Sequence, residues 1–226
     1  MLERVTILCK LIKFKIFNFS IFLQHHFRVQ KKLVFESNLF NDIVQFNFKE
    51  NYYNLTLKTI AALRWATINF SKTRFILKID TDAYLRPNLF LNQIRHLSLN
   101  KIYGWARGPE PPPRNKFYKN CIDPLYYPYK TYPPAVITTY FIPGVLLSKL
   151  YRAIVSKPKI FTIPALPVED IYVSILAFKA NIKLKRFSGI YWNGNEKTLR
   201  KYNTISLLIG KISEKTILKS WNSSLT

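Results

Sequence analysis

Apolar residues between positions 54 and 70 recur with the period of a helix. In "NLTLKTIAALRWATINF" one helical face carries Leu57, Ile60, Ala61, Trp65 and Ile68. Asn54 stands directly before this stripe and belongs to the residue types that cap helix N-termini with a side-chain oxygen. The pattern predicts a helix that begins after Asn54 and buries the stripe.

Other segments have the short apolar runs of strands. The run "RFILKI" shows no alternation, which is typical of a strand that is covered on both faces. Three further segments are predicted as strands: "KFKIFNF" (13–19), "KIYGWAR" (101–107) and "IKLKRF" (182–187). The uncharged run 131–148 contains three prolines and does not read as a membrane span.

Three more helices are predicted between these strands. Pro87 stands in the first turn of one helix, where its missing N–H costs nothing. Ser148 caps "SKLYRAIVSK", and Pro167 opens "PVEDIYVSILAFKA", whose first turn carries two acids that the helix dipole favours. Helices that alternate with strands predict one α/β domain with a mostly parallel central sheet flanked by helices.

A long loop is predicted for residues 108–134, because this stretch is rich in Pro and Tyr and has no hydrophobic period. Long ordered loops within compact domains are often functional.

The positive charge of the chain favours anionic partners. It has 35 Lys and Arg against 12 Asp and Glu, a formal net charge of +23. The basic residues are scattered and no nucleic-acid motif accompanies them, so we expect a solvated basic surface and no nucleic-acid partner. Lysines interrupt the apolar N-terminal segment 1–23, which therefore lacks the character of a clean membrane span.

Two pairs of acids stand out against this basic background. Asp80 and Asp82 directly follow a predicted buried strand, where ligands bind in open α/β sheets. Two carboxylates at this spacing suit a hard divalent cation that also contacts substrate phosphates. The alternative is that one acid caps the following helix and the other pairs with a surface lysine.

The second pair is Glu169 and Asp170, which lie next to apolar residues at the start of a predicted helix. A carboxylate in such a place can act as a general base. The alternative is a pair of helix-capping acids.

Several sequence blocks, in order, resemble the β-1,3-galactosyltransferase family, glycosyltransferase family 31. They are "FESNLFNDIVQFNF", "ENYYNLTLKTIAALRW", "FILKIDTD", "YKTYPP", "PGVLLS" and "VEDIYVSILAFKANIKLKRF". The resemblance covers about residues 33–190 and implies one glycosyltransferase catalytic domain spanning 1–226. Residues 1–32 would be an altered or truncated N-terminal part, and 191–226 a C-terminal extension.

The resemblance implies a Rossmann-like GT-A fold and an inverting transferase. Such enzymes move a hexose or N-acetylhexosamine from a UDP-sugar to a glycan hydroxyl in β-1,3 linkage, with Mn²⁺ as cofactor; galactose is the favoured sugar here. The acceptor would be a glycan on a glycoprotein or glycolipid. The family is lumenal in the Golgi and membrane-associated, although this chain shows no clear anchor.

The same resemblance assigns roles to individual residues. Asp82 would be the first metal ligand and Asp80 the second, and Asp170 would be the catalytic base, with Glu169 as the alternative. Lys78 matches a family lysine that either contacts phosphate or supports the strand. We expect the two acidic pairs to converge around one cleft.

Three tyrosines of the long loop are candidates to stack on the acceptor sugar: Tyr118, Tyr127 and Tyr132. The alternative for each is ordinary packing within the loop.

Some positions depart from the family pattern. Thr81 replaces the middle acid of the metal motif, Ser174 replaces a glycine, and two expected cysteines are missing. A catalytically impaired relative that binds a glycan or a nucleotide-sugar therefore remains an alternative.

Overall fold

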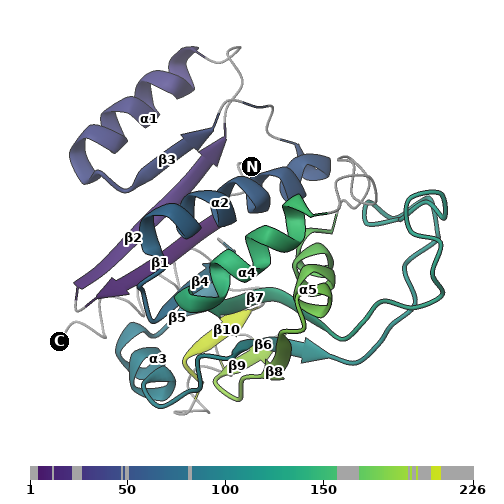
Figure 1. Ribbon diagram of the computed structural model, residues 1–226. Helices are drawn as coiled ribbons and strands as arrows, with labels where there is room; N and C mark the ends of the chain where they lie inside the picture. The colour runs from purple at the N-terminus through teal and green to yellow at the C-terminus, as the bar shows by residue number, and fades with distance from the viewer. Residues whose placement is uncertain are drawn as a thin grey trace.

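The computed structural model describes residues 5–11, 13–21, 27–46, 48, 51–80, 83–156, 168–192, 194, 197 and 205–209. Helices and strands alternate along much of this part of the chain (Figure 1). The helices are α1 (Phe27–Phe40), the 3₁₀ turn η1 (Tyr52–Asn54), α2 (Leu55–Phe70), α3 (Pro87–Ile94), α4 (Gly144–Val155) and α5 (Glu169–Lys179). The strands are β1 (Val5–Leu11), β2 (Lys13–Ile21), β3 (Ile43–Phe46), β4 (Phe75–Ile79), β5 (Ala83–Leu85), β6 (Lys101–Arg107), β7 (Ala135–Pro143), β8 (Lys183–Arg186), β9 (Ile190–Trp192) and β10 (Leu207–Ile209).

The main sheet is mixed, which corrects the expectation of a mostly parallel one. Its strand order is β3-β2-β1-β4-β7-β6-β8. The β2–β3 and β6–β8 pairings are parallel, whereas the other four pairings among these strands are antiparallel. The physical reason lies in two strands: β7 enters between β4 and β6 and runs against both, and β1 lies between β2 and β4 and runs against both. Antiparallel neighbours need no helical crossover. A second sheet has the order β5-β10-β9.

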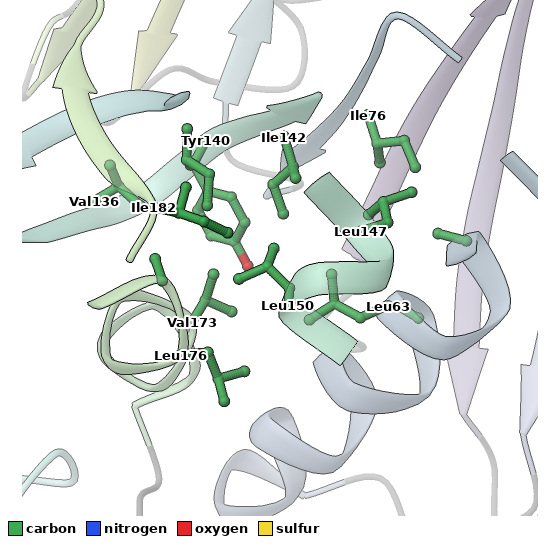
Figure 2. Close-up of a cluster of buried hydrophobic side chains, with 14 of the residues drawn as sticks. Leu63, Ile76, Val136, Tyr140, Ile142, Leu147, Leu150, Val173, Leu176 and Ile182 are labelled. Carbon is green, nitrogen blue, oxygen red and sulfur yellow. The ribbon is translucent and has the colours of Figure 1, made fainter. Parts of the chain in front are cut away.

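Both faces of β4 are covered, as the lack of alternation in its sequence predicts, and all five of its residues are buried. On one face Ile76 joins a cluster with residues of α2, α4 and α5 (Figure 2). On the other face Phe75 and Leu77 pack with Phe90 of α3 and Phe141 of β7. The end of β4 therefore lies in the middle of the domain, where a polar side chain needs a partner.

The packing of α2 differs from the prediction. Its buried face consists of Thr56, Lys58, Thr59, Ala62, Leu63 and Ala66. The expected stripe is only partly buried, and Ile68 is exposed. Small side chains at 62 and 66 allow α4 to approach closely, so the contact forms on the alanine face of α2 rather than on its bulky stripe.

Helix α4 begins earlier than predicted, so Ser148 lies inside it and does not cap it. The start is set by Gly144, where an added Cβ would lie 2.1 Å from the carbonyl oxygen of Thr73. At the other helix starts, Pro87 occupies the first turn of α3 as predicted. Asn54 holds the N-cap position of α2 without a capping side-chain hydrogen bond.

Candidate active site

Lys78 is the centre of a buried polar cluster at the carboxyl end of β4. Its Nζ lies 2.8 Å from Oδ1 of Asp80 and 2.5 Å from Oε1 of Glu169. It also donates a hydrogen bond of 2.7 Å to the carbonyl oxygen of Thr138 in β7. One ammonium group thus joins the acid that follows β4 to an acid that begins α5, residues that lie far apart in the sequence.

Local sequence explains how these groups meet. Side chains alternate across a strand, so Lys78 points to the same face as Ile76, the face covered by helices. Helix α5 packs beside β7 and directs its N-terminus to that place. Its first turn holds Glu169 and Asp170, both buried. A charged group out of water requires a partner, and here the ammonium and the carboxylates supply one another.

Burial and the ion pairs change the pKa of Lys78, Glu169 and Asp170. Burial raises the pKa of Glu169 to about 7, although Lys78 opposes that rise. Burial also raises the pKa of Asp170, against the opposing effects of Lys78 and of two backbone N–H groups. Burial disfavours the charged form of Lys78, but Glu169 and Asp80 outweigh it and hold the pKa of the ammonium well above its ordinary value. Lys78 is therefore charged at neutral pH, and Glu169 changes its charge near pH 7.

A bulge in β7 positions the third partner of the lysine. Gly104 pairs with Tyr140 and Trp105 with Ile137, so Thr138 and its successor fall between two consecutive pairs. Thr138 has a φ of 60°, a left-handed conformation that is uncommon for a β-branched residue.

Asp170 holds this bulge from the side of α5. Its Oδ2 accepts a hydrogen bond of 3.0 Å from the backbone N–H of Thr138, and its Oδ1 accepts one of 2.8 Å from Ile171. The carbonyl of the same Thr138 accepts from Lys78. Asp170 therefore binds the N–H group, and Lys78 the carbonyl group, of one residue with a strained backbone conformation.

Ser174, which replaces a glycine of the family pattern, fastens α5 to β7. Its hydroxyl donates a hydrogen bond of 2.8 Å to the carbonyl oxygen of Asp170 and accepts one of 3.0 Å from the N–H of Val136. This buried hydroxyl ties the turn that carries the acids to the adjoining strand.

The expected metal site is only partly within the described residues. Asp82, the first predicted ligand, and Thr81 lie outside them. Asp80 is partly exposed and directs Oδ1 at Lys78, and its carboxylate type suits a hard divalent cation. Within the described residues, no group of three or more His, Cys, Asp or Glu side chains is arranged to hold a metal ion.

The tyrosines of the long loop divide into two groups. Tyr127 and Tyr132 are buried with Ile122 and Ile175, so these two pack within the loop and against α5 and are not open to a sugar. Burial raises the pKa of both phenols. Tyr118 is exposed, and of the three it alone has a face that a ligand could reach.

Sequence reasoning did not identify the bulge or β7 as parts of the site. The bulge has a signal in the sequence: Gly104 inside "KIYGWAR" marks a place where two backbones approach closely. An added Cβ there would lie 2.8 Å from the carbonyl oxygen of Thr139 and 2.9 Å from Cβ of Tyr140. A left-handed threonine at 138 has no comparable signal.

The profile of the family described as "Galactosyltransferase" matches residues 21–188, which is well over half of the chain. The chain belongs to the galactosyltransferase family. The α/β fold of the chain agrees with the GT-A fold expected from the resemblance.

Curated relatives support the same family. The chain is 30% identical over 164 residues to "Beta-1,3-galactosyltransferase brn" of Drosophila melanogaster, covering 69% of this chain and 48% of that protein. It is 28% identical over 159 residues to human "Beta-1,3-galactosyltransferase 2", covering 68% and 36%. It is 27% identical over 175 residues to human "Lactosylceramide 1,3-N-acetyl-beta-D-glucosaminyltransferase", covering 75% and 44%. The chain thus spans less than half the length of these relatives.

Proposed function

We propose that this galactosyltransferase-family protein is an inverting, UDP-sugar-dependent β-1,3-glycosyltransferase. It transfers a hexose or N-acetylhexosamine, with galactose favoured, to a hydroxyl of a glycan acceptor. The observation that carries the proposal is the convergence of Asp80 with Glu169 and Asp170 around Lys78. This arrangement brings a carboxylate that can bind a metal ion and two candidate general bases to one site. An in-line displacement at a sugar carbon needs both kinds of group.

On the donor side, we assign Asp80 and Asp82 to a divalent cation, with Mn²⁺ as the expected ion. A cation held there would stabilise the negative charge that builds on the diphosphate as UDP leaves. Lys78 is already engaged by two carboxylates and a carbonyl. We therefore assign it the structural role of positioning these acids, in preference to direct contact with phosphate.

On the acceptor side, we assign Asp170 as the general base, with Glu169 as the alternative. Two backbone N–H groups fix the orientation of the Asp170 carboxylate, as is required of a group that must remove a proton from one hydroxyl. Glu169 has a pKa of about 7, which suits a base that works near neutral pH. Inversion needs one of them opposite the departing UDP.

The experiment is an assay of UDP release from UDP-galactose and a glycan acceptor, with Mn²⁺ or with EDTA. We expect loss of turnover in EDTA and in Asp82→Ala, and at least a hundredfold loss in the variant of the true base. Asp170→Asn and Glu169→Gln are compared, with Glu110→Gln as the control, because the side chain of Glu110 forms an exposed ion pair with Arg107. Metal-independent turnover that Asp82→Ala leaves unchanged would refute the proposal.

The pH profile separates the two candidate bases. If Glu169 is the base, the acid limb of kcat/KM lies near pH 7 and disappears in Glu169→Gln. If Asp170 is the base, Glu169→Gln keeps a pH-dependent acid limb. Donor binding without transfer to any acceptor would instead identify a catalytically impaired relative.

We also propose that the protein works in the Golgi lumen, in association with the membrane. The support is the family to which the chain belongs. Among the described helices, none combines the length and the apolar character needed to cross a bilayer. Microscopy of the tagged protein against a Golgi marker tests the location, and a cytosolic distribution would contradict it.

A further inference from the structure

The chain contains four Asn-x-Ser/Thr sequences, the acceptor motif for N-linked glycosylation. They begin at Asn18, Asn54, Asn69 and Asn222, and none has proline in the middle position. A glycan is a bulky hydrophilic group, so a modified asparagine has to lie at the surface of the folded domain. The structure can therefore separate these four sequences, although the motif alone does not.

Two of the four motifs begin in places with little room. Asn18 belongs to β2, an interior strand with β1 on one side and β3 on the other. Asn54 is half-buried at the N-cap of α2, and Thr56, the third residue of its motif, is buried. An interior strand and a half-buried helix start are poor places for a bulky group. Asn222 lies outside the described residues.

Asn69 has different surroundings. It is exposed in the last turn of α2, and Ser71, the third residue of its motif, is partly exposed directly after the helix. The Nδ2 atom of Asn69, which would carry the sugar, donates a hydrogen bond of 2.8 Å to the carbonyl oxygen of Trp65. An asparagine amide has two N–H groups and glycosylation replaces one, so the other can keep this bond. Of the acceptor asparagines whose side chains the structure describes, Asn69 is the exposed one.

The helix also offers a surface to the first sugar. Residues four apart on a helix are neighbours, so Trp65 lies beside Asn69. The side chain of Trp65 is only partly buried, and its ring packs against that of Phe70, with the two ring centroids 4.9 Å apart. Aromatic side chains present large apolar faces. A sugar attached to Asn69 would therefore lie next to a ring on which its C–H groups could pack.

The position is remote from the candidate active site. Residues 71–74 connect α2 to the start of β4 at Phe75, whereas Asp80 follows the other end of that strand. The five residues of β4 alone extend about 16 Å. Figure 1 shows the last turn of α2 on the opposite side of the domain from α5, the helix that carries the other two acids. A glycan at Asn69 would leave the site open.

We propose that Asn69 is a site of N-linked glycosylation. The sugar donor is an oligosaccharide carried on a lipid pyrophosphate. The bond from Nδ2 of Asn69 to C1 of the first sugar forms as the C1–O bond to the pyrophosphate breaks, and Nδ2 loses one proton. The proposal rests on the lumenal location that belongs to the proposed function, because this transfer takes place in the secretory lumen. It does not depend on catalytic activity of the protein.

The test is mass spectrometry of the full chain, produced in eukaryotic cells and treated with peptide N-glycosidase in ¹⁸O-labelled water, which converts a glycosylated asparagine to labelled aspartate. We expect the label at position 69. Ser71→Ala should abolish it and Ser71→Thr should retain it, because the motif requires a hydroxyl residue there. Neither substitution changes the two residues that form the Asn69–Trp65 hydrogen bond. Asn54→Gln is the matched control and should keep the label.

An unlabelled Asn69 in the parent chain would overturn the proposal, and so would a label that survives Ser71→Ala. A second preparation of the same chain, directed to the secretory lumen by an added cleavable signal, identifies which part failed. A label at Asn69 in that preparation alone would overturn modification of the native protein by refuting its lumenal location. Absence of the label from both preparations would overturn the site itself.

A second measurement separates the glycan from catalysis. Asn69→Gln, which cannot carry the glycan, should release UDP at the rate of the parent, because the position lies at the far end of β4 from Asp80. Circular dichroism verifies that the variant is folded. A loss of turnover in folded Asn69→Gln would overturn the remote position of the glycan. If the parent releases no UDP although Asn69 carries the label, the proposed function fails and the modification stands.

Discussion

The cost of burying Glu169 predicts a specific dependence of stability on pH. The perturbation is Glu169→Gln, which keeps the size of the side chain but removes its ability to ionise. The carboxyl group is buried and contacts the ammonium of Lys78, and burial raises its pKa from 4.5 to about 7. The native protein therefore holds a proton at this position over a range of pH in which the unfolded chain has released it.

The sign and size follow from proton linkage. Between about pH 4.5 and 7 the native state binds more protons than the unfolded state, so stability falls as the pH rises. A tenfold change in an ionisation constant corresponds to about 1.4 kcal/mol, so the shift is equivalent to about 3 kcal/mol. This contribution is complete below pH 4.5, is lost by about pH 7.5 and changes little above that. It is a large fraction of the 5–15 kcal/mol that stabilises typical domains.

The assay is urea unfolding of both proteins at pH 5, 6, 7 and 8, all approximate values within the window set by linkage. The informative quantity is the difference in free energy of unfolding between the parent and Glu169→Gln, because other titrating groups contribute similarly to both. We expect the parent to lose about 3 kcal/mol of unfolding free energy relative to Glu169→Gln between pH 5 and pH 8. A difference that stays constant across this range, within error, would refute the buried, protonatable state of Glu169.

Three further predictions test the supports of the site. Gly104→Ala should lower the free energy of unfolding by about 1–3 kcal/mol, because the added Cβ would lie 2.8 Å from a carbonyl oxygen of β7. The control is Gly108→Ala, whose added Cβ has no neighbour within 4 Å. Equal urea midpoints for the two variants would contradict the close approach of the backbones at the bulge. Lys78→Met should lower the free energy of unfolding by about 3–5 kcal/mol at pH 8, because it leaves buried carboxylates without their cation. The loss should be smaller at pH 5, where Glu169 is neutral. A loss of stability that does not depend on pH would contradict this explanation. Arg114→Ala should accelerate amide hydrogen exchange across residues 110–132 with little change in global stability, since Arg114 donates to three carbonyls of the loop; unchanged exchange there would show that the loop does not depend on it.

The local elements were mostly predictable from the sequence, but their arrangement was less so. Continuous apolar runs identified β4 and β6, and Pro87 marked the start of α3. Strand β7 was missed because prolines surround it, and β1 was missed as well; these two omissions led to the expectation of a mostly parallel sheet. The buried face of α2 was misassigned because hydrophobicity favours its large side chains, whereas helix contact selects its small ones.

The site shows the same division between local and long-range information. The pattern placed the pair Asp80 and Asp82 after a buried strand and a second pair of acids at a helix start, and the structure brings Asp80 and Glu169 to the same lysine. Because side chains point alternately to the two faces of a strand, the sequence of β4 indicates which face Lys78 occupies. It does not indicate which groups Lys78 contacts there, since its partners come from β7 and α5. Tyr127 and Tyr132 illustrate the converse case: a tyrosine in a loop pattern suits a ligand surface or a local core equally well, and packing decides.

The energetics of the lysine cluster indicate why such an arrangement is present. Removing charges from water costs several kcal/mol for each ion, and mutual attraction recovers this only when the geometry is good, so a buried ion pair adds little net stability. The cluster also includes a left-handed threonine, a conformation that costs about 1–3 kcal/mol. A hydrophobic side chain at position 78 with matching apolar neighbours would hold β4 and α5 together without these penalties. The arrangement instead fixes the carboxylates of Asp80 and Glu169 on one ammonium, and Asp170 on the bulge that faces it. Its benefit is the position of these acids and the raised pKa of Glu169 and Asp170, which a transfer reaction can use and which folding alone does not require.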